Sequence, residues 1–386
     1  MTLHTSEQLA FLRQSEIRNM TIECVKVAGI NLAQGVCDTE LPEPVQRGAA
    51  EAMAQGTNSY TRYDGLTELR QAIARKVLRD SGAHVDAESE VVVTSGATGA
   101  FYAACLALFD PGDAVVLFEP YYGYHLDTLR ALALTPTLVP LAQPSWSFEV
   151  AALRAAIGPK TRAIVVNTPG NPSGKVFSRS ELEAIASVAQ EHDLYVITDE
   201  IYEYFRYDGH EHVSLASLPG MRARSVTIGG FSKTFSITGW RIGYLLATPE
   251  LCYKIGHVHD LVYVCAPAPL QIGVARGLDA LQPSFYEDLR AEYARKREKL
   301  CSALERAGIS PHVPSGAYYV LADSRRIPGS TPKQRALTLL QRCGVAAVPG
   351  NAFFESGRGD DLLRFSYAKR EPELDEACRR LDSFRP

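Results

Sequence analysis

The chain has 386 residues, of which 46% are hydrophobic and 22% are charged. This length and composition are typical of a folded protein with two or three lobes. The formal net charge is −4, from 40 basic and 44 acidic side chains, which argues against a nucleic acid as the main partner. No apolar run reaches the length of a membrane span, and the first residues lack the apolar core of a secretory signal. We therefore expect a cytoplasmic protein that binds neither nucleic acid nor membrane.

The cysteines give no sign of a metal site. All eight are scattered along the chain, none forms a C-x-x-C pair, and no Cys/His cluster has the spacing of zinc ligands. Such thiols usually pack as small hydrophobic side chains in a reducing compartment. We expect no metal ion.

The first large segment alternates short apolar runs with helical patterns. Apolar runs at 91–93, 114–118, 163–166, 194–197 and 225–228 predict five strands. Ser178 and Glu181 form a capping box at the start of one intervening helix. Strands separated by helices predict a mostly parallel sheet sandwiched by helices, an α/β fold. Ligands bind such sheets beyond the carboxyl ends of the strands, where the polar motifs of this chain collect.

The pattern changes near residue 287. A charged helix is expected over 291–308, followed by apolar segments at 316–323, 345–350 and 362–368 and a helix over 331–344. These elements predict a smaller α+β lobe, which the N-terminal residues could join. We expect a large domain at 45–286, and a small domain formed by 1–44 together with 287–386.

The first motif is SGATGA at 95–100, between a strand and a helix. Its backbone N–H groups could bind an anion, although a tight connection alone would explain the glycines. GATG also resembles the start of a dinucleotide-binding unit, with Glu119 at a tolerable distance as the ribose-binding acid. Because only Gly96 and Gly99 match that pattern, a nucleotide-binding oxidoreductase remains as an alternative.

Two further motifs end strands. In NTPGNPSG, at 167–174, Asn171 could simply bond its own turn or could donate its amide to a ligand oxygen. In DEIYEYF, Asp199 could cap a helix or could be a buried acid held ionised by a cationic ligand nitrogen. Tyr202, three residues later, would point the same way from a helical turn.

Two cations stand in apolar surroundings. Lys233 follows the strand at 225–228, and burial there would free its amine as a nucleophile toward a carbonyl carbon. Ser232 and Arg241 close to it suit a phosphate dianion. Arg364, inside the late apolar run, needs either a protein carboxylate or a substrate carboxylate as its partner.

Taken together, these motifs resemble a known family. GGFSKTFSITGWRIG, at 229–243, is similar to the lysine signature of fold-type I pyridoxal-phosphate enzymes of the class I/II aminotransferase family. SGATGA, NTPGNPSG, DEIYEYF and Arg364 follow that family's order, and the resemblance spans roughly residues 30 to 370. Five motifs in order are far more specific than any one of them.

The resemblance implies a role for each matching residue. Lys233 would form the Schiff base with pyridoxal 5'-phosphate and shuttle the proton, and Asp199 would pair with the ring nitrogen. The other expected contacts are these: the phosphate with Gly96, Ala97, Thr98, Ser232 and Arg241; the phenolic oxygen with Tyr202 and Asn171; the ring face with Tyr122; and the substrate carboxylate with Arg364, Asn171 and Gly35. Tyr60 matches a tyrosine that reaches the neighbouring subunit's phosphate, which implies a homodimer with shared sites.

The expected activity is amino-group transfer from an amino acid to a 2-oxo acid. A carbon–sulfur lyase using the same cofactor is the main alternative, because the same catalytic set serves both reactions. Tyr63, Tyr122, Tyr124 and Phe353 favour an apolar or aromatic substrate side chain, whereas Arg18 or Arg62 could bind a second carboxylate. Cys37 replaces the proline of the family's Gly-x-Pro-Asp, which leaves the shape of the pocket there open.

Overall fold

The computed structural model describes residues 6–385. A seven-stranded sheet forms the centre of the larger part, in the strand order β2-β8-β7-β6-β5-β3-β4. Only β8 runs antiparallel to its neighbours. The strands of this sheet are β2 (Val91–Ser95), β3 (Ala114–Glu119), β4 (Thr135–Pro140), β5 (Thr161–Asn167), β6 (Tyr195–Asp199), β7 (Ser225–Gly230) and β8 (Ile242–Leu246). The five strands expected from the sequence are all present.

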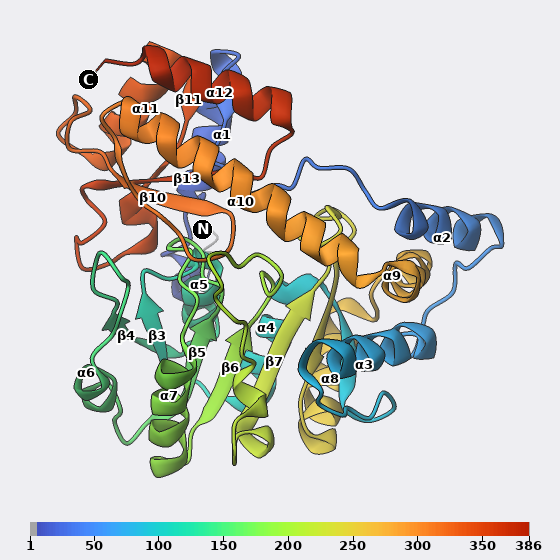
Figure 1. Ribbon diagram of the computed structural model, residues 1–386. Coiled ribbons are helices and arrows are strands. Elements are labelled where there is room, and N and C mark those ends of the chain that lie inside the picture. Colours follow the sequence, from blue (N-terminus) through green and yellow to red (C-terminus); the bar gives the residue numbers. More distant parts are fainter. Residues whose placement is uncertain (1–5, 386) are drawn as a thin grey trace, which may run out of the picture.

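Helices cover both faces of this sheet, as Figure 1 shows. One face packs against α4 (Gly96–Leu108), α5 (Gly123–Ala131) and α8 (Pro249–Tyr263). The other packs against α6 (Val150–Ala155) and α7 (Arg179–Glu191), and at the β2 end against α3 (Thr67–Ser81) and α9 (Ala268–Ala280). Alternate residues of each strand supply the two cores: Val116 and Val196 face α7, while Val115 and Ile197 face α4. The capping box of Ser178 and Glu181 begins α7 as expected.

A four-stranded antiparallel sheet, β12-β13-β10-β9, forms the centre of the smaller part. Its strands are β9 (Ser310–His312), β10 (Tyr319–Asp323), β12 (Val348–Pro349) and β13 (Leu362–Ser366), packed with α10 (Pro283–Arg306), α11 (Pro332–Cys343) and α12 (Glu371–Ser383). The long helix begins eight residues before the expected start at 291, because Pro283 opens its first turn. Figure 1 shows α10 running above the large sheet.

The N-terminal segment joins the smaller part. Within it, α1 (Glu16–Lys26) precedes β1 (Ile30–Asn31), which pairs in parallel with β11 (Val345–Ala346). Next along the chain, α2 (Glu43–Ala54) packs against α9. The described residues also contain four short 3-10 helices, at Glu7–Leu9, Leu215–Ser217, Arg222–Arg224 and Gly350–Phe353. The domain boundaries at 45 and 286 remain a prediction, part of which falls on residues 1–5 and 386, outside the described chain.

Candidate active site

A cavity of about 700 Å³ opens where the parallel strands end. Most of the side chains predicted from the sequence line it, although they come from distant segments. They are Gly35, Ala97, Thr98, Tyr122, Asn171, Asp199, Tyr202, Ser232, Lys233, Arg241 and Arg364. Two predicted residues lie elsewhere in the single chain: Gly96 packs behind Arg241, and the side chain of Tyr60 is 83% exposed.

Lys233 lies in the turn that follows β7. Its amine donates one hydrogen bond, to the Gly35 carbonyl at 3.3 Å, and its side chain is partly buried rather than fully enclosed. No carboxylate among residues 6–385 forms an ion pair with it. The amine therefore faces the cavity without a charged protein partner, which leaves it available to a ligand carbonyl.

An anion cradle lies beside the lysine. Arg241 donates to Thr98 Oγ1 at 2.9 Å and to the Thr238 carbonyl at 3.0 Å. A side chain at Gly96 would overlap the guanidinium, so only glycine allows this approach. The helix α4 starts at Gly96, and the Ser95 side chain makes no capping bond to its free N–H groups. Helix N–H groups, a hydroxyl and a guanidinium together suit a phosphate.

Asp199 ends β6 with its carboxylate buried. Its Oδ1 accepts from the Ile201 backbone N–H at 3.2 Å, and its Oδ2 lies 3.1 Å from His125 Nε2. Residues 201–204 form hydrogen-bonded turns, so the expected helical turn carrying Tyr202 is absent, and Asp199 caps no helix. His125, on α5, was not predicted, since a single histidine after a strand end gives no sign of its partner.

Asn171 and Arg364 contact each other across the cavity wall. Arg364 Nη1 donates to Asn171 Oδ1 at 2.8 Å, and Nη2 donates to the Ala33 carbonyl at 2.6 Å. The side-chain oxygen of Asn167 accepts the backbone N–H of Asn171 at 2.8 Å. The asparagine whose side chain bonds the backbone of this turn is therefore Asn167, whereas the Asn171 side chain contacts Arg364. No protein carboxylate in the described residues pairs with Arg364, and its Nε has no partner. A buried guanidinium in this state suits an external carboxylate.

Two of the phenols at the cavity, those of Tyr202 and Tyr122, remain protonated near neutral pH. Burial raises the pKa of Tyr202 well above its ordinary value, and the adjacent Tyr319 raises it further. Burial likewise raises the pKa of Tyr122. The Tyr202 hydroxyl lies 3.0 Å from the Tyr319 hydroxyl, a pair that was not predicted. Tyr202 can therefore donate its proton to a ligand oxygen.

The segment around Cys37 shapes the wall through its backbone. Gly35 and Val36 line the cavity, whereas Cys37 is buried in the core between the two parts of the chain. Burial raises the pKa of the Cys37 thiol, although Lys233 opposes the shift. Cys37, at the position of the proline in the pattern it resembles, thus belongs to the core and is not among the residues that line the cavity.

The expected specificity residues divide into two groups. Arg18, Tyr122, Tyr124 and Phe353 line the cavity, together with Phe11, Ile17 and Gln34, which the motifs did not indicate. In the single chain Tyr63 and Arg62 do not line it. Arg62 instead pairs with Asp64 at 2.6 Å and with Glu88.

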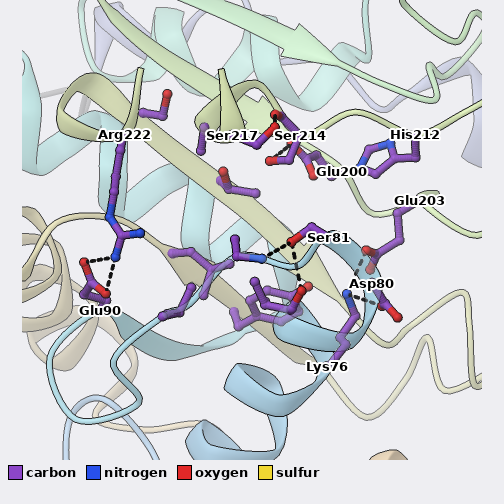
Figure 2. A pocket seen from close by; sticks show the side chains of 18 of the residues that line it. Lys76, Asp80, Ser81, Glu90, Glu200, Glu203, His212, Ser214, Ser217 and Arg222 are labelled. Atoms are coloured by element: carbon purple, nitrogen blue, oxygen red, sulfur yellow. Dashed lines mark hydrogen bonds and ion pairs between the residues drawn. The ribbon is translucent and has the colours of Figure 1, made fainter. Parts of the chain in front are cut away.

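A second, separate cavity of about 220 Å³ lies over β7 and β8 of the large sheet (Figure 2). It is bounded by α3, by the loop that follows β6 and by residues of β7 and β8, and it shares no lining residue with the first cavity. Lys76 is buried at its wall, 2.7 Å from Glu203 and 3.3 Å from Asp80. Glu200, next to Asp199 in the chain, accepts from Ser214 there. Adjacent carboxylates of the DE pair thus face two different cavities.

Comparison with known proteins decides the family. The family model described as aminotransferase class I and II matches residues 27–381. The chain belongs to the aminotransferase class I and II family. Members of that family generally depend on pyridoxal phosphate. In this aminotransferase Lys233, Asp199, Arg241 and Arg364 line one cavity.

Several relatives are similar over nearly their whole length. The probable N-succinyldiaminopimelate aminotransferase of Mycobacterium tuberculosis is 36% identical over 94% of both chains. A solved structure of N-succinyldiaminopimelate aminotransferase from that organism superimposes with a TM-score of 0.95 at 35% identity, covering 98% of this chain and 99% of that one. The methionine aminotransferase of Escherichia coli is 34% identical over 91% of each chain. The aspartate aminotransferase of Thermus thermophilus with maleate superimposes with a TM-score of 0.91 at 32% identity and 99% coverage of both.

These relatives support amino-group transfer and give no support to the lyase or the nucleotide-binding oxidoreductase. The acid expected to bind a ribose, Glu119, instead accepts the backbone N–H groups of Glu355 and Ser356. None of the helices in residues 6–385 is both long and apolar enough to cross a bilayer. Because the relatives are named for different amino acids, their names do not assign a substrate to this aminotransferase.

Proposed function

We propose that this aminotransferase binds pyridoxal 5'-phosphate at Lys233 and moves an amino group from an L-amino acid to a 2-oxo acid. The observation that carries the proposal is a set of four groups around one cavity: an amine without a charged partner, a buried carboxylate, an anion cradle and a guanidinium without a carboxylate partner among the described residues. Each suits one part of the cofactor or the substrate.

The residues present fit the cofactor. The cradle of Gly96, Ala97, Thr98, Ser232 and Arg241 would hold the phosphate, because it combines helix N–H groups, hydroxyls and a guanidinium. Asp199 would hold the protonated ring nitrogen, and His125 would orient that carboxylate. Tyr202 and Asn171 would donate to the phenolic oxygen, and Tyr122 would cover a face of the ring.

When bound, pyridoxal phosphate supplies an aldehyde carbon that takes up an amino group and a ring that accepts electrons. The side chains supply binding and proton movement. Among the described residues that line the cavity, Lys233 is the one lysine, and the lining histidine, His125, already contacts Asp199. The Lys233 amine would therefore take the proton from the substrate α-carbon and return it. Arg364 would bind the α-carboxylate through the two N–H groups of its fork, which fixes the direction of that carbon.

The cavity wall supports an apolar or aromatic substrate side chain. Phe11, Ile17, Tyr124 and Phe353 are among the residues that line it. Arg18, which is exposed at the rim and has no ion pair among the described residues, would instead favour a second anionic group. A donor screen separates these two classes directly.

We further propose a cytoplasmic homodimer with shared active sites. The exposed Tyr60 lies outside the cavity of its own chain, which supports a role at the phosphate of a second copy. Residues 45–286 would form the large domain, and residues 1–44 with 287–386 the small one, since the two sheets draw their strands from these ranges. The free cysteines support a reducing compartment.

Covalent trapping tests the proposal. The purified protein is incubated with pyridoxal phosphate, reduced with borohydride, digested and mapped by mass spectrometry. We expect a pyridoxyl label on Lys233 and none in the Lys233→Ala variant. Lys254, an exposed lysine on α8, serves as the control for nonspecific labelling. A label that is absent from Lys233, or that is equal on both lysines, would refute the proposal.

A half-reaction screen identifies the donor and tests the reaction type. The loaded protein is mixed with each common amino acid, without a 2-oxo acid, while the absorbance of the cofactor is followed. A transferase stops after one equivalent of 2-oxo acid per site, because the amino group stays on the enzyme. Continuous release of pyruvate and ammonia would instead indicate a lyase.

A further inference from the structure

Tyr319 contacts both Tyr202, proposed to bind the cofactor, and Arg364, proposed to bind the substrate. No sequence motif had indicated it. It begins β10 and is nearly inaccessible to solvent. Its hydroxyl lies 3.0 Å from the Tyr202 hydroxyl, and its ring centre lies 4.3 Å from the guanidinium carbon of Arg364. One side chain thus contacts both the phenol proposed for the cofactor and the guanidinium proposed for the substrate.

The ring of Tyr319 fixes the plane of the Arg364 guanidinium. Phe353 lies on the guanidinium as well, with its ring centre 4.8 Å from the same carbon. The edge of the group is held by Asn171 and the Ala33 carbonyl. Aromatic contact and hydrogen bonds at the edge leave the arginine few rotamers, which reduces the ordering cost when a carboxylate binds.

The hydroxyl of Tyr319 fixes the direction of a proton. A phenol has one proton, so in the pair of hydroxyls only one can donate to the other. If Tyr319 donates to the Tyr202 oxygen, the Tyr202 proton remains free to point into the cavity. Donation in this direction also strengthens the bond that Tyr202 makes to an anionic ligand oxygen.

Gly35 completes the arrangement. A methyl group at this position would overlap the Tyr319 hydroxyl and the ring atoms next to it. The Gly35 carbonyl meanwhile accepts from Lys233 at 3.3 Å and from Tyr318 at 3.1 Å. Because Gly35 has no side chain, the Tyr319 hydroxyl can reach Tyr202. The carbonyl of Gly35 still accepts the hydrogen bond of Lys233.

We propose that Tyr319 is a positioning residue that orients the Tyr202 proton through its hydroxyl and the Arg364 guanidinium through its ring. This assignment rests on the proposed function, because it concerns groups that would hold pyridoxal phosphate and its substrate. The two effects belong to different atoms of one side chain, so two substitutions separate them. Tyr319→Phe removes only the hydroxyl, and Tyr319→Leu removes the ring as well.

The first readout is the pH at which the absorbance of the bound cofactor changes, measured without substrate. A hydrogen bond from Tyr202 to the phenolic oxygen favours the more negative form of the cofactor, so weakening that bond raises the apparent pKa. We expect Tyr319→Phe to raise it by about half a unit, and Tyr202→Phe to raise it more. Tyr367→Phe is the matched control, because Tyr367 is equally buried but bonds the Ala317 carbonyl, outside the cavity.

The second readout is the half-saturating concentration of the donor amino acid that the half-reaction screen identifies. We expect Tyr319→Leu to raise it about tenfold, while Tyr319→Phe changes it less than twofold. Tyr367→Phe should leave both readouts unchanged. Melting temperatures of all variants, measured with and without pyridoxal phosphate, report folding independently of activity.

The outcomes distinguish the two proposals. If the wild-type protein binds no pyridoxal phosphate, the proposed function fails and the assignment of Tyr319 fails with it. If the wild-type protein binds the cofactor but the Tyr319 variants shift neither readout, the assignment alone is overturned. A lower melting temperature with both readouts unchanged would show a purely structural tyrosine and would overturn it as well.

Discussion

His125 and Asp199 meet beneath the candidate cofactor site, with the histidine Nε2 3.1 Å from the carboxylate Oδ2. Both side chains are buried, and the second oxygen, Oδ1, accepts the Ile201 N–H. The ring of Phe101 lies against the imidazole, with 4.4 Å between the ring centres. A buried carboxylate held on both oxygens keeps one orientation, which is the requirement for pairing with a ligand nitrogen.

Replacing Asp199 by Asn should lower kcat/KM for the best donor by at least about a hundredfold, because a neutral amide cannot hold the ring nitrogen protonated. His125→Gln should cost less, about tenfold, since it disturbs only the orientation of the acid. Steady-state kinetics measure both effects. Asp193→Asn is the control, because that side chain is 93% exposed. Equal activity of Asp199→Asn and wild type would contradict the assigned role.

Arg364→Lys should act mainly on substrate binding. A lysine keeps the charge but loses the planar fork, the bond to Asn171 and the stacking between two rings. We expect the half-saturating donor concentration to rise about 10- to 100-fold, which corresponds to the loss of one charged hydrogen bond. The binding of pyridoxal phosphate itself, followed by absorbance, should change little. Arg325→Lys, on an exposed side chain, is the matched control.

Gly35→Ala should disrupt the site without touching any charged group. The added methyl group would overlap the Tyr319 hydroxyl, so either the backbone at Gly35 or the tyrosine must move. We expect kcat/KM to fall at least about tenfold, with recovery of part of the loss when Tyr319 is also replaced by Leu. Gly56→Ala offers a comparison, since no atom lies near the added methyl and only its positive φ is strained. A double variant no better than the sum of the singles would exclude direct overlap.

The sequence predicted five of the seven strands of the large sheet and most of the cavity residues, because both follow from local patterns; β4 and β8 were missed. Apolar runs report burial, and the polar residue that ends each run necessarily reaches the carboxyl edge of a parallel sheet. Asp199, the last residue of β6, and Lys233, shortly after β7, are examples. The charged pattern predicted a helix from residue 291, whereas α10 begins at Pro283, a residue that often opens a helix.

The partners of those residues could not be predicted in the same way. His125 contacts Asp199 across 74 positions, and Tyr202 contacts Tyr319 across 117. Hydrophobic periodicity predicts that a side chain is buried, but it does not predict which residue that side chain contacts. The Ala33 carbonyl that binds Arg364 carries no side-chain signal at all. The second cavity was missed for a related reason: Ser225 and Thr227 look like ordinary strand residues until their neighbours are known.

His259 should make stability depend on pH. Its Nε2 accepts the backbone N–H of Ser95 at 2.9 Å, just before the anion cradle, and burial lowers the pKa of the imidazole to about 4. In the unfolded chain the ordinary pKa is about 6.5. The neutral ring therefore stabilises the fold fully above pH ~6.5, and this contribution, up to about 3 kcal/mol, is lost as the pH falls toward 4.

Calorimetric melting of wild type and His259→Gln across that window checks this expectation. An amide can still accept the Ser95 N–H but does not titrate, so the melting temperature of the variant should fall less steeply between pH 6.5 and 4.5. Other groups titrate equally in both proteins and cancel in the difference. Parallel curves would show that His259 is protonated in the folded state at the same pH as in the unfolded chain.

The ion pair in the second cavity should contribute to stability and not to catalysis (Figure 2). Burial lowers the pKa of Lys76, but the nearby Glu203 and Asp80 outweigh that effect and hold it well above its ordinary value. The pKa of a lysine in the unfolded chain is about 10. Because the pKa of Lys76 is higher in the folded chain, its charge stabilises the fold at every pH below that unfolded value and is lost only at higher pH. The ion pair is therefore fully formed near neutral pH. Lys76→Met leaves the partly buried Glu203 without its cation, whereas Asp80 is exposed enough to be solvated by water, so we expect a cost of about 2–3 kcal/mol of unfolding free energy.

A double-mutant cycle tests this contribution. Because Lys76→Met/Glu203→Leu removes the buried cation together with its nearest carboxylate, it should destabilise the fold less than the sum of the single variants. Lys254→Met breaks an exposed pair with Glu250 and should cost less than about 1 kcal/mol. Urea unfolding at neutral pH measures each free energy. Since no residue of this cavity lines the active site, kcat/KM of the folded variants should remain within about twofold of wild type. A strictly additive cycle would mean that Lys76 and Glu203 are stabilised separately, by other neighbours in the cavity wall.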